Sequence, residues 1–305
     1  MAEPSLISVD WGTSSFRAYL VGASGEVRER AEGPWGILNT PDNAFEDVLE
    51  SVLSTWLERY PNLPTLASGM ITSRQGWIET PYLTTPCNLS DLARSLISHT
   101  TASGRTIHFV AGLRHHDAEG TPDVMRGEET QILGCFPESG DTALLILPGT
   151  HSKWVRLENR ALTRFATYMT GEVFAALRDH TILGRLMVTG PFRREGFLRG
   201  LTAGMAGEGA LLHRLFASRT LTLFHQLEKE AAADYLSGLL IGEELREGRA
   251  NFMRTRESVL LVGNSDLVDR YATALDFMEA DWRRAPSDVV AQGHYRIAGA
   301  TSLLA

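Results

Sequence analysis

The chain has 305 residues, a length that suggests two domains at about 100 to 200 residues per domain. Hydrophobic residues make up 43% and charged residues 22%, which excludes a disordered, collagen-like or coiled-coil chain. The 29 Lys and Arg residues against 37 Asp and Glu residues give a net charge of −8, the opposite of the basic charge that nucleic-acid binding requires. We therefore expect an enzyme that acts on small molecules, with no nucleic-acid partner.

The sequence also argues against a membrane or disulfide-stabilised protein. The longest apolar runs, such as residues 236–242, are too short to cross a bilayer, and the first residues do not have the pattern of a secretion signal. We expect a cytoplasmic protein with no membrane partner. The two cysteines, Cys87 and Cys135, are too few for a disulfide scaffold or a multi-cysteine metal site.

The first half of the chain alternates predicted strands and helices. Two apolar segments flank a turn at Gly12 and predict a β-hairpin. Apolar residues at steps of three and four then predict an amphipathic helix that Pro61 and Pro64 end. This alternation is typical of α/β proteins. The predicted strands are 6–9, 16–21, 63–68 and 106–111, and the predicted helices are 43–59 and 89–97.

The second half begins with strands and continues mainly with helices. Its first apolar run ends at Pro148 and Gly149. The predicted strands are 143–147, 153–157, 162–168 and 259–262, and the predicted helices are 171–180, 208–216, 228–247 and 267–278.

Two segments of the chain are similar to each other. Residues 7–20 and 144–157 both contain a strand, a Gly-Thr turn with hydroxyl residues, and a second strand. A Gly-Thr turn exposes backbone N–H groups and a hydroxyl without a bulky Cβ, which suits the binding of phosphate oxygens. One such turn is common in hairpins, but a copy in each half predicts two similar lobes. We place the first lobe at residues 1–140 and the second at 141–305, with the last helix packing back on the first lobe.

The two turns carry a family resemblance. They read Asp10-Trp11-Gly12-Thr13-Ser14-Ser15-x-Arg17 and Pro148-Gly149-Thr150-His151-Ser152-Lys153-Trp154. This pair resembles the phosphate loops of the actin, Hsp70 and sugar-kinase superfamily. The segments GMI at 69–71, VMRGEETQ at 124–131, MTGE at 169–172 and SGLLIG at 237–242 more narrowly resemble the 2-dehydro-3-deoxygalactonokinase family. The resemblance runs from residue 7 to about residue 300.

The resemblance implies both a fold and an activity. The implied fold is α/β, a two-lobed actin-like ATPase (ribonuclease H-like) fold with duplicated mixed sheets flanked by helices and a cleft between the lobes. The implied activity is ATP-dependent phosphorylation of the 6-hydroxyl of 2-dehydro-3-deoxy-D-galactonate, a step of galactonate breakdown, with Mg²⁺ as the metal. A preference for this sugar acid over its gluconate epimer does not follow from the sequence.

The first turn supplies the expected metal and phosphate contacts of the first lobe. Asp10 ends a strand, and as in superfamily members its carboxylate is expected to hold Mg²⁺; a turn-capping aspartate is the alternative. Thr13 and Ser14, after Gly12, are expected to contact phosphates through hydroxyl and N–H groups. Arg17 is expected to pair with phosphate or with the substrate's carboxylate, because a guanidinium binds either in a bidentate manner; an exposed strand arginine is the alternative.

The second lobe is expected to bind the rest of the nucleotide. Gly149, Thr150 and Ser152 are the predicted phosphate contacts of the second turn, and Lys153 either neutralises the transferred phosphoryl group or projects into solvent. After the strand at 259–262, Gly263 and Asn264 are expected to let the nucleotide lie close to the backbone. Glu243 or Glu244 is a candidate for the ribose.

The catalytic base is expected to be a carboxylate shortly before the second turn, where superfamily kinases place it. Asp123, Glu128 and Glu129 are the candidates, and we select Glu128, which opens a predicted helix with Arg126 close by. The helix macrodipole favours acidic residues in a first turn by about 0.3 to 1 kcal/mol whatever the function. The superfamily more often has aspartate in this role, so all three residues stay open.

The sugar acid requires a cationic or N–H-rich pocket for its carboxylate and an aromatic or apolar wall. Arg126, Arg74 and Trp77 are the candidates, together with Gly69 and Met70 in the loop GMITSRQG, whose small residues permit close backbone approach. A flexible surface loop would have the same composition.

Two other functions remain alternatives. A phosphatase of the exopolyphosphatase type also has a Gly-Glu-Glu helix start before a phosphate loop, and it would release phosphate without a sugar acceptor. A non-catalytic actin-like module would bind ATP without turnover. We expect small-molecule partners only, and a homodimer as the commonest assembly of soluble enzymes.

Overall fold

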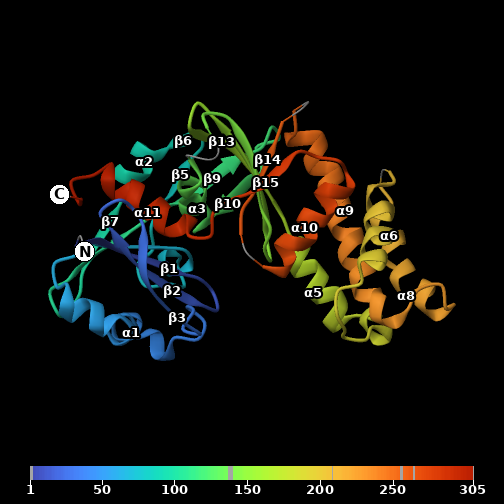
Figure 1. Ribbon diagram of the computed structural model, residues 1–305, viewed down its shortest axis with the longest axis horizontal. Coiled ribbons are helices and arrows are strands. Elements are labelled where there is room, and N and C mark those ends of the chain that lie inside the picture. Colours follow the sequence, from blue (N-terminus) through green and yellow to red (C-terminus); the bar gives the residue numbers. More distant parts are fainter. Residues whose placement is uncertain (1–2, 137–139, 208, 255–256, 264, 305) are drawn as a thin grey trace. The chain divides into compact units, whose positions relative to one another are not determined.

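The computed structural model describes residues 3–136, 140–207, 209–254, 257–263 and 265–304 (Figure 1). The chain divides into two compact units, each described below by itself. Unit 1 comprises Met1–Thr142, Leu157–Arg164 and Pro286–Ala305, and unit 2 comprises Ala143–Arg156 and Phe165–Ala285. The C-terminal segment therefore belongs to the unit that contains the N-terminus.

Unit 1 contains a six-stranded mixed sheet. Its strands are β1 (Pro4–Trp11), β2 (Phe16–Gly22), β3 (Val27–Gly33), β4 (Thr65–Ser68), β7 (Ile97–Thr100) and β8 (Thr106–Phe109). They lie in the order β3-β2-β1-β4-β8-β7. The hairpin predicted around Gly12 is confirmed as the antiparallel pair β1–β2, whereas β1 and β4, and β4 and β8, run parallel.

Helices and a small second sheet complete unit 1. The helices are α1 (Phe45–Arg59), α2 (Leu89–Arg94), α3 (Glu128–Gly134) and α11 (Val289–Gly299), with the 3₁₀ turns η1 (Pro41–Asn43) and η2 (Met70–Thr72). The small sheet has the order β10-β9-β5, from β5 (Tyr82–Thr84), β9 (Gly112–His116) and β10 (Pro122–Met125). The predicted apolar face of α1, including Leu49 and Leu53, is buried in one core with Ile7 and Val9 of β1.

Helix α11 packs on α3 with unusually close backbone contact. A Cβ atom on Gly293 would lie 2.0 Å from the Thr130 carbonyl oxygen, and one on Gly134 would lie 1.8 Å from that of Val289. The Arg296 guanidinium also donates to the Gly134 carbonyl oxygen at 3.1 Å. The C-terminal helix therefore fixes the position of α3, which carries the three-residue segment Glu128 to Thr130.

Unit 2 is built on a second mixed sheet. The sheet has the order β15-β14-β11-β12-β13-β6, from β6 (Cys87–Asn88), β11 (Ala143–Leu147), β12 (Ser152–Glu158), β13 (Ala161–Tyr168), β14 (Val259–Leu261) and β15 (Trp282–Arg284). Strand β6 and the residues of β12 and β13 within Leu157–Arg164 belong to unit 1. β11 and β14, and β14 and β15, run parallel. The order β13-β12-β11-β14-β15 repeats the order β3-β2-β1-β4-β8 of unit 1, so the duplication predicted from the two Gly-Thr turns is confirmed.

The remainder of unit 2 is helical (Figure 1). Its helices are α5 (Thr170–His180), α6 (Arg194–Met205), α7 (Leu211–Leu215), α8 (Ala217–Leu223), α9 (Ala232–Phe252) and α10 (Asp266–Phe277), with the 3₁₀ turns η3 (Gly184–Leu186) and η4 (Lys229–Ala231). Glycines on α6 and α9 bring these two backbones together. A Cβ on Gly200 would lie 2.0 Å from the Tyr235 carbonyl oxygen, and one on Gly238 would lie 2.0 Å from that of Phe197.

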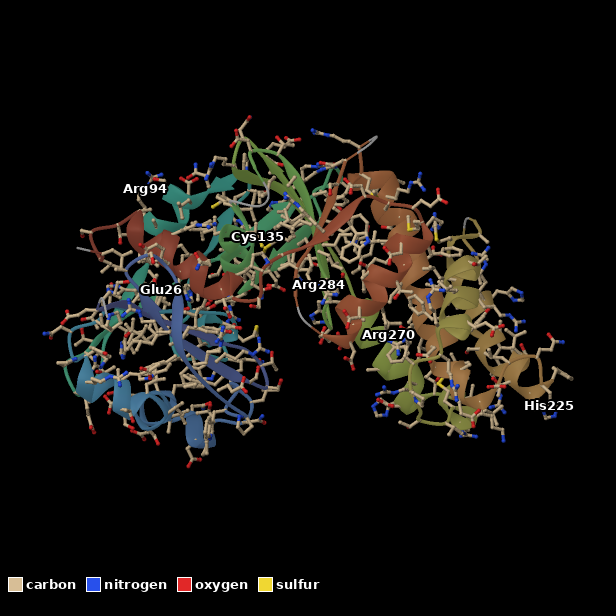
Figure 2. All side chains as sticks on the ribbon, viewed as in Figure 1. Glu26, Arg94, Cys135, His225, Arg270 and Arg284 are labelled. Carbon is tan, nitrogen blue, oxygen red and sulfur yellow. The ribbon has the colours of Figure 1, made fainter. Side chains whose placement is uncertain are left out.

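Some predicted elements differ from the structure. The helix predicted over 89–97 ends at Arg94, and its last residue, Ile97, instead begins strand β7. The helix predicted over 208–216 is observed as α7 and the start of α8; Glu208 lies outside the described residues. Helix α6 was not predicted. Both cysteines are buried, with Cys135 at the C-terminal end of α3 (Figure 2). Within the described ranges, the helices are too short or too polar to span a membrane.

Candidate functional site

Asp10 lies near the C-terminal end of β1, directly opposite Arg17 of β2. Arg17 Nη1 donates to Asp10 Oδ2 at 3.4 Å, and 17% of the Asp10 side chain is exposed against 53% for Arg17. Burial raises the pKa of Asp10; the Arg17 charge opposes this increase and the Glu128 charge adds to it. Asp10 and Glu128 are therefore electrostatic neighbours although they are far apart in sequence.

Two glycines allow three segments of backbone to converge at Asp10. Gly69 directly follows β4, has φ of +95°, and a Cβ there would lie 2.8 Å from the Trp11 carbonyl oxygen and 3.4 Å from Asp10 Oδ1. Gly127 directly precedes α3, has φ of +109°, and a Cβ there would lie 3.1 Å from the Gly69 Cα. Both φ values favour glycine. The ends of β1 and β4 and the start of α3 thus meet at one edge of the sheet.

The two glutamates that open α3 have different surroundings. Glu128 is half-buried, and its Oε2 accepts a hydrogen bond from the Arg126 N–H at 3.0 Å. Glu129 is completely buried, and both of its carboxylate oxygens accept from the Gly127 N–H, at 2.9 and 2.7 Å. Burial, with the Glu128 charge, raises the pKa of Glu129 to about 7. Glu129 therefore holds the Gly127 backbone from within the protein interior. The Glu128 side chain is partly exposed, so a ligand can contact it.

The third carboxylate candidate lies on the small sheet. Asp123 is a residue of β10, paired in register with His115 of β9. Its Oδ1 accepts the N–H of the next residue, Val124, at 2.7 Å. Glu128, in contrast, opens α3 directly after Gly127, whose added Cβ would lie 3.1 Å from the Gly69 Cα beside Asp10. Of the three candidates, the geometry brings Glu128 to Asp10.

The first Gly-Thr turn exposes its hydroxyl residues. The Gly12 N–H donates to the Ser15 carbonyl oxygen at 2.9 Å, and both Thr13 and Ser14 are exposed. The segment after β3 packs directly against the backbone of this turn, since a Cβ on Gly36 would lie 2.3 Å from the Thr13 carbonyl oxygen. No local sequence pattern marks Gly36 for this role, because its contact is with a turn more than twenty residues away.

The second Gly-Thr turn rests on the start of α5. A Cβ on Gly171 would lie 2.5 Å from the Gly149 carbonyl oxygen, and the Glu172 N–H donates to the Thr150 carbonyl oxygen at 2.9 Å. Thr150 is exposed and Gly149 is half-buried. His151 Nε2 and Glu172 Oε2 lie 2.5 Å apart and tie the turn to the helix a second time.

Two predicted phosphate contacts of this turn lie in the interior of unit 2. Ser152 is fully buried, and its hydroxyl donates to Glu244 Oε1 at 2.8 Å. Lys153 is 4% exposed, so the alternative in which it projects into solvent is wrong. Glu244 is 3% exposed, and the hypothesis that it reaches a ribose is also wrong, because its carboxylate is enclosed by side chains of unit 2.

The predicted adenosine loop is described only in part. Gly263 follows β14 with φ of +122°, and a Cβ there would meet the Val268 side chain at 3.0 Å. Asn264 lies outside the described residues.

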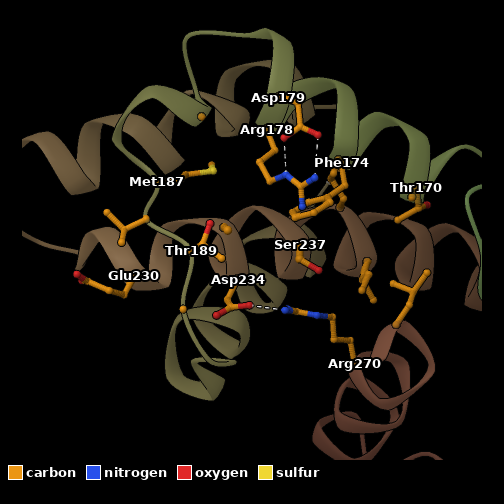
Figure 3. Close-up of a pocket in the computed structure, with 18 of the residues that line it drawn as sticks. Thr170, Phe174, Arg178, Asp179, Met187, Thr189, Glu230, Asp234, Ser237 and Arg270 are labelled. Carbon is orange, nitrogen blue, oxygen red and sulfur yellow. Dashed lines mark hydrogen bonds and ion pairs between the residues drawn. The ribbon is translucent and has the colours of Figure 1, made fainter. Parts of the chain in front are cut away.

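A cavity of about 770 Å³ lies in unit 2 beside the second turn (Figure 3). Thr150 and Gly171 line it, as do two residues from α10, Leu267 and Arg270. Figure 3 shows Arg270 and Asp234 of α9 pointing toward each other, with 2.6 Å between Arg270 Nη2 and Asp234 Oδ1. The other lining residues are mixed in character: Thr170, Phe174, Arg178, Asp179, Gly184, Met187, Val188, Thr189, Gly190, Glu230, Ala233, Ser237, Leu240 and Ile241.

Among the predicted substrate residues, Arg126 is engaged in contacts with its own unit. Its Nη1 donates to Thr72 Oγ1 and Thr80 Oγ1, both at 2.6 Å, and its guanidinium lies 4.3 Å from the centre of the Tyr82 ring. These contacts tie the segment before α3 to the Gly69–Gly76 loop. The guanidinium of this predicted substrate residue is therefore already hydrogen-bonded to threonines of unit 1.

The other predicted substrate residues lie on the loop itself. Arg74 is exposed, 87% by side chain, and pairs with Glu79 at 3.5 Å. Met70 and Trp77 are half-buried against the core of unit 1, with the Trp77 ring edge-on to Phe109 at 5.6 Å between centroids. Gly69, described above, is the member of this set that approaches Asp10.

Comparison with known proteins identifies the family. The model of the 2-keto-3-deoxy-galactonokinase family matches residues 10–297. The chain belongs to this family. It is 31% identical to the 2-dehydro-3-deoxygalactonokinase of Escherichia coli (strain K12), over 95% of this chain and 96% of that protein. It is 34% identical to a protein of Rhizobium meliloti (strain 1021) assigned to the same activity, over 92% of each chain.

Solved structures agree with the family assignment and the fold. The crystal structure of a protein from Sinorhizobium meliloti, assigned as a 2-dehydro-3-deoxygalactonokinase, matches with a TM-score of 0.88 and 33% identity over 97% of both chains. Component A of the (R)-2-hydroxyglutaryl-CoA dehydratase of Acidaminococcus fermentans matches with a TM-score of 0.52 at 11% identity. The α/β fold of actin-like ATPases, with its duplicated mixed sheets, is therefore confirmed for this chain.

Proposed function

We propose that the protein transfers the γ-phosphoryl group of ATP to the 6-hydroxyl of 2-dehydro-3-deoxy-D-galactonate, giving the 6-phosphate and ADP. The observation that carries the proposal is the close approach of Gly127, Gly69 and the end of β1, which brings the start of α3, with Glu128, to the strand end that carries Asp10 and the exposed turn of Thr13 and Ser14. Family membership supports the same assignment. The chemistry needs a base at the acceptor, a cation at the phosphates and a turn to orient them.

Glu128 is the base in this proposal. The acceptor oxygen attacks the γ-phosphorus, the new O–P bond forms as the bond to the β-phosphate oxygen breaks, and the hydroxyl proton passes to the Glu128 carboxylate. Glu129 cannot take this proton while both its oxygens accept the Gly127 N–H and its side chain is fully buried. The Arg126 N–H on Glu128 Oε2 orients the carboxylate.

Asp10 is the proposed Mg²⁺ ligand. Mg²⁺ usually binds one or two carboxylates together with phosphate oxygens and waters. Asp10 fits this role, because burial and the neighbouring Glu128 charge raise its pKa and a cation would relieve both effects. Clusters of three or more metal-ligating side chains do not occur in the described part of the chain, which agrees with a metal held largely by substrate. When bound, the ion neutralises charge on the phosphate oxygens.

The cavity of unit 2 is the proposed nucleotide site. Its volume of about 770 Å³ falls within the range of about 300 to 1,000 Å³ that is usual for small-ligand pockets. Thr150 offers a hydroxyl from the second turn, Phe174 and Leu240 offer apolar surface for a base, and Ser237 offers a hydroxyl. Gly149 allows close approach of phosphate to backbone, while Ser152 and Lys153 support the turn from the interior. Gly263 and Asn264 stay predicted contacts.

Two exposed arginines are the proposed cations for the ligands of unit 1. Arg17 lies beside Asp10, so we assign it to phosphate at the reacting end of the substrate. Arg74 lies on the Gly69–Gly76 loop with an exposed guanidinium, and we assign it to the carboxylate at the other end of the sugar acid. Met70 and Trp77 supply the apolar wall, and Arg126 positions the loop.

A cytoplasmic location and a homodimer stay predictions of the sequence.

A coupled ADP-release assay with Mg-ATP tests the proposal. The assay compares 2-dehydro-3-deoxy-D-galactonate, its gluconate epimer, and no acceptor. Turnover with the galactonate compound alone supports both the activity and its stereospecificity, and equal turnover with both epimers removes the stereospecificity. Phosphate release without an acceptor would indicate a phosphatase of the exopolyphosphatase type. ATP binding without turnover would indicate a non-catalytic nucleotide-binding module.

A further inference from the structure

Glu244, in the middle of α9, is the centre of a buried hydrogen-bond network in unit 2. Its Oε1 accepts from the Ser152 hydroxyl and from Trp154 Nε1, both at 2.8 Å. Its Oε2 accepts from the Thr170 hydroxyl and the Tyr271 hydroxyl, both at 2.5 Å. A carboxylate offers about four acceptor positions on its two oxygens, so these four donors use its full capacity.

The four donors come from three elements, with Ser152 and Trp154 on β12, Thr170 on α5 and Tyr271 on α10. Ser152 directly follows the second Gly-Thr turn and begins β12. Thr170 begins α5 and lines the cavity together with Thr150. Tyr271 lies on α10, next to Arg270, which also lines the cavity. One carboxylate thus connects the phosphate turn with two of the helices that form the cavity wall.

This arrangement costs free energy that simple core packing would avoid. Glu244 is 3% exposed, and a buried carboxylate is unfavourable unless hydrogen bonds satisfy it. Burial raises its pKa, and the hydrogen bonds from Thr170, Tyr271, Trp154 and Ser152 oppose the increase. An apolar side chain would fill the space without that cost, but only a polar group fixes the directions of several donors at once.

We propose that Glu244 is a positioning residue for nucleotide binding, which aligns the second phosphate turn, the start of α5 and helix α10. This inference rests on the proposed nucleotide site in unit 2. Glutamine in place of Glu244 keeps the shape but replaces one acceptor oxygen by an NH₂ donor, so two of the four donors lose their acceptor. The turn and the two helices then lose their common alignment.

Calorimetric titration with ADP, together with steady-state kinetics, tests the role. Glu244→Gln is expected to raise the Kd for ADP and the KM for ATP about 10-fold or more, with the KM for the sugar acid within about 2-fold. Tyr271→Phe removes a single hydroxyl and is expected to raise the Kd for ADP about 3-fold, and to have no further effect in a Glu244→Gln background. Glu247→Gln is the matched control, because Glu247 lies on the same helix and its side chain is exposed.

The outcomes separate this inference from the proposed function. If the wild-type protein binds no ADP, the nucleotide site itself is wrong. If the wild type binds ADP and folded Glu244→Gln binds it equally well, only the positioning role is overturned. If Glu244→Gln does not fold, Tyr271→Phe decides, since a lower Tm with an unchanged Kd for ADP would mean that the network serves stability alone.

Discussion

Gly127 and Gly69 approach so closely that a Cβ atom on Gly127 would lie 3.1 Å from the Gly69 Cα. Gly69 precedes the loop proposed to hold the sugar acid, and Gly127 precedes the proposed base, Glu128. Gly69 also lies against the Trp11 carbonyl oxygen beside Asp10. The spacing between the metal ligand, the base and the acceptor loop therefore depends on two residues that have no side chain.

Gly69→Ala should disturb this spacing. Gly69 has φ of 95° and ψ of −158°, a region that is essentially restricted to glycine, and the new Cβ would lie 2.8 Å from the Trp11 carbonyl oxygen. We expect a loss of about 2 to 4 kcal/mol in the free energy of unfolding, with a lower kcat in the protein that remains folded. Urea unfolding and steady-state kinetics measure both.

Gly104→Ala is the control for this prediction. Gly104 also has a positive φ, +85°, but no heavy atom lies within 4 Å of its added Cβ. Gly104→Ala therefore introduces backbone strain without a steric clash. We expect it to lower the free energy of unfolding by about 1 to 2 kcal/mol and to leave kcat unchanged. Equal effects of the two substitutions on kcat would contradict the role of the glycine contact.

Asp10→Asn should change the metal dependence of the reaction. An amide is a weaker Mg²⁺ ligand than a carboxylate, and loss of several kcal/mol of charge stabilisation corresponds to at least about 10²-fold in kcat/KM for Mg-ATP. A Mg²⁺ titration at fixed ATP should show a higher half-saturating concentration. Asp47→Asn, an exposed change on α1, is the control. A variant with the wild-type Mg²⁺ profile would remove Asp10 from the metal site.

Glu129 should make stability depend on pH. Its pKa rises from 4.5 in the unfolded chain to about 7 in the folded protein, chiefly through burial. The folded state therefore binds this proton more tightly, and the stability that the protonated group contributes is complete below pH 4.5 and lost as pH rises through 7. Relative to Glu129→Gln, the wild type should lose about 3 kcal/mol of unfolding free energy between pH 4.5 and pH 8.

Urea unfolding of both proteins across this range measures the difference. Glu58→Gln, an exposed change on α1, is the matched control. Parallel pH curves for the wild type and Glu129→Gln would show that the Glu129 pKa is the same in the folded and unfolded states, contrary to its buried position.

Gly200→Ala should destabilise unit 2, because the added Cβ would lie 2.0 Å from the Tyr235 carbonyl oxygen and force α6 away from α9. Overpacking of this kind lowers the free energy of unfolding by about 1 to 3 kcal/mol or more. Gly299→Ala, in the last turn of α11 and with its nearest contact at 3.7 Å, should be close to neutral. Thermal unfolding compares them, and a neutral Gly200→Ala would show that the two helices are not in direct backbone contact.

The sequence predicted elements whose pattern is local. Helix α1 has apolar residues at regular steps and a proline after its end, and the β1–β2 hairpin has apolar runs around a Gly-Thr turn. Helix α6 has glycines at positions 196, 200 and 204, which lower helix propensity. Gly200 and Gly204 lie against the backbone of α9, a tertiary contact that the segment alone does not reveal.

The site was predictable to a similar degree. Asp10, Glu128 and the two turns were identified because motif and position in the chain mark them. The cavity of unit 2 was missed, since Phe174, Ser237 and Arg270 come from three helices whose contact depends on the fold. The sequence indicates Arg126 as a candidate for the substrate but not its hydrogen bonds to Thr72 and Thr80, because these form only when distant loops meet.

The most direct test of the account is kcat of Glu128→Gln with Mg-ATP and 2-dehydro-3-deoxy-D-galactonate, measured together with the Kd for ADP. Loss of a positioned base should lower kcat by roughly 10² to 10⁴ and leave the Kd for ADP within about 2-fold, while the matched variant Asp123→Asn keeps kcat near wild type. A folded Glu128→Gln with wild-type kcat, or an equal loss in Asp123→Asn, would contradict the assignment of Glu128 as the base.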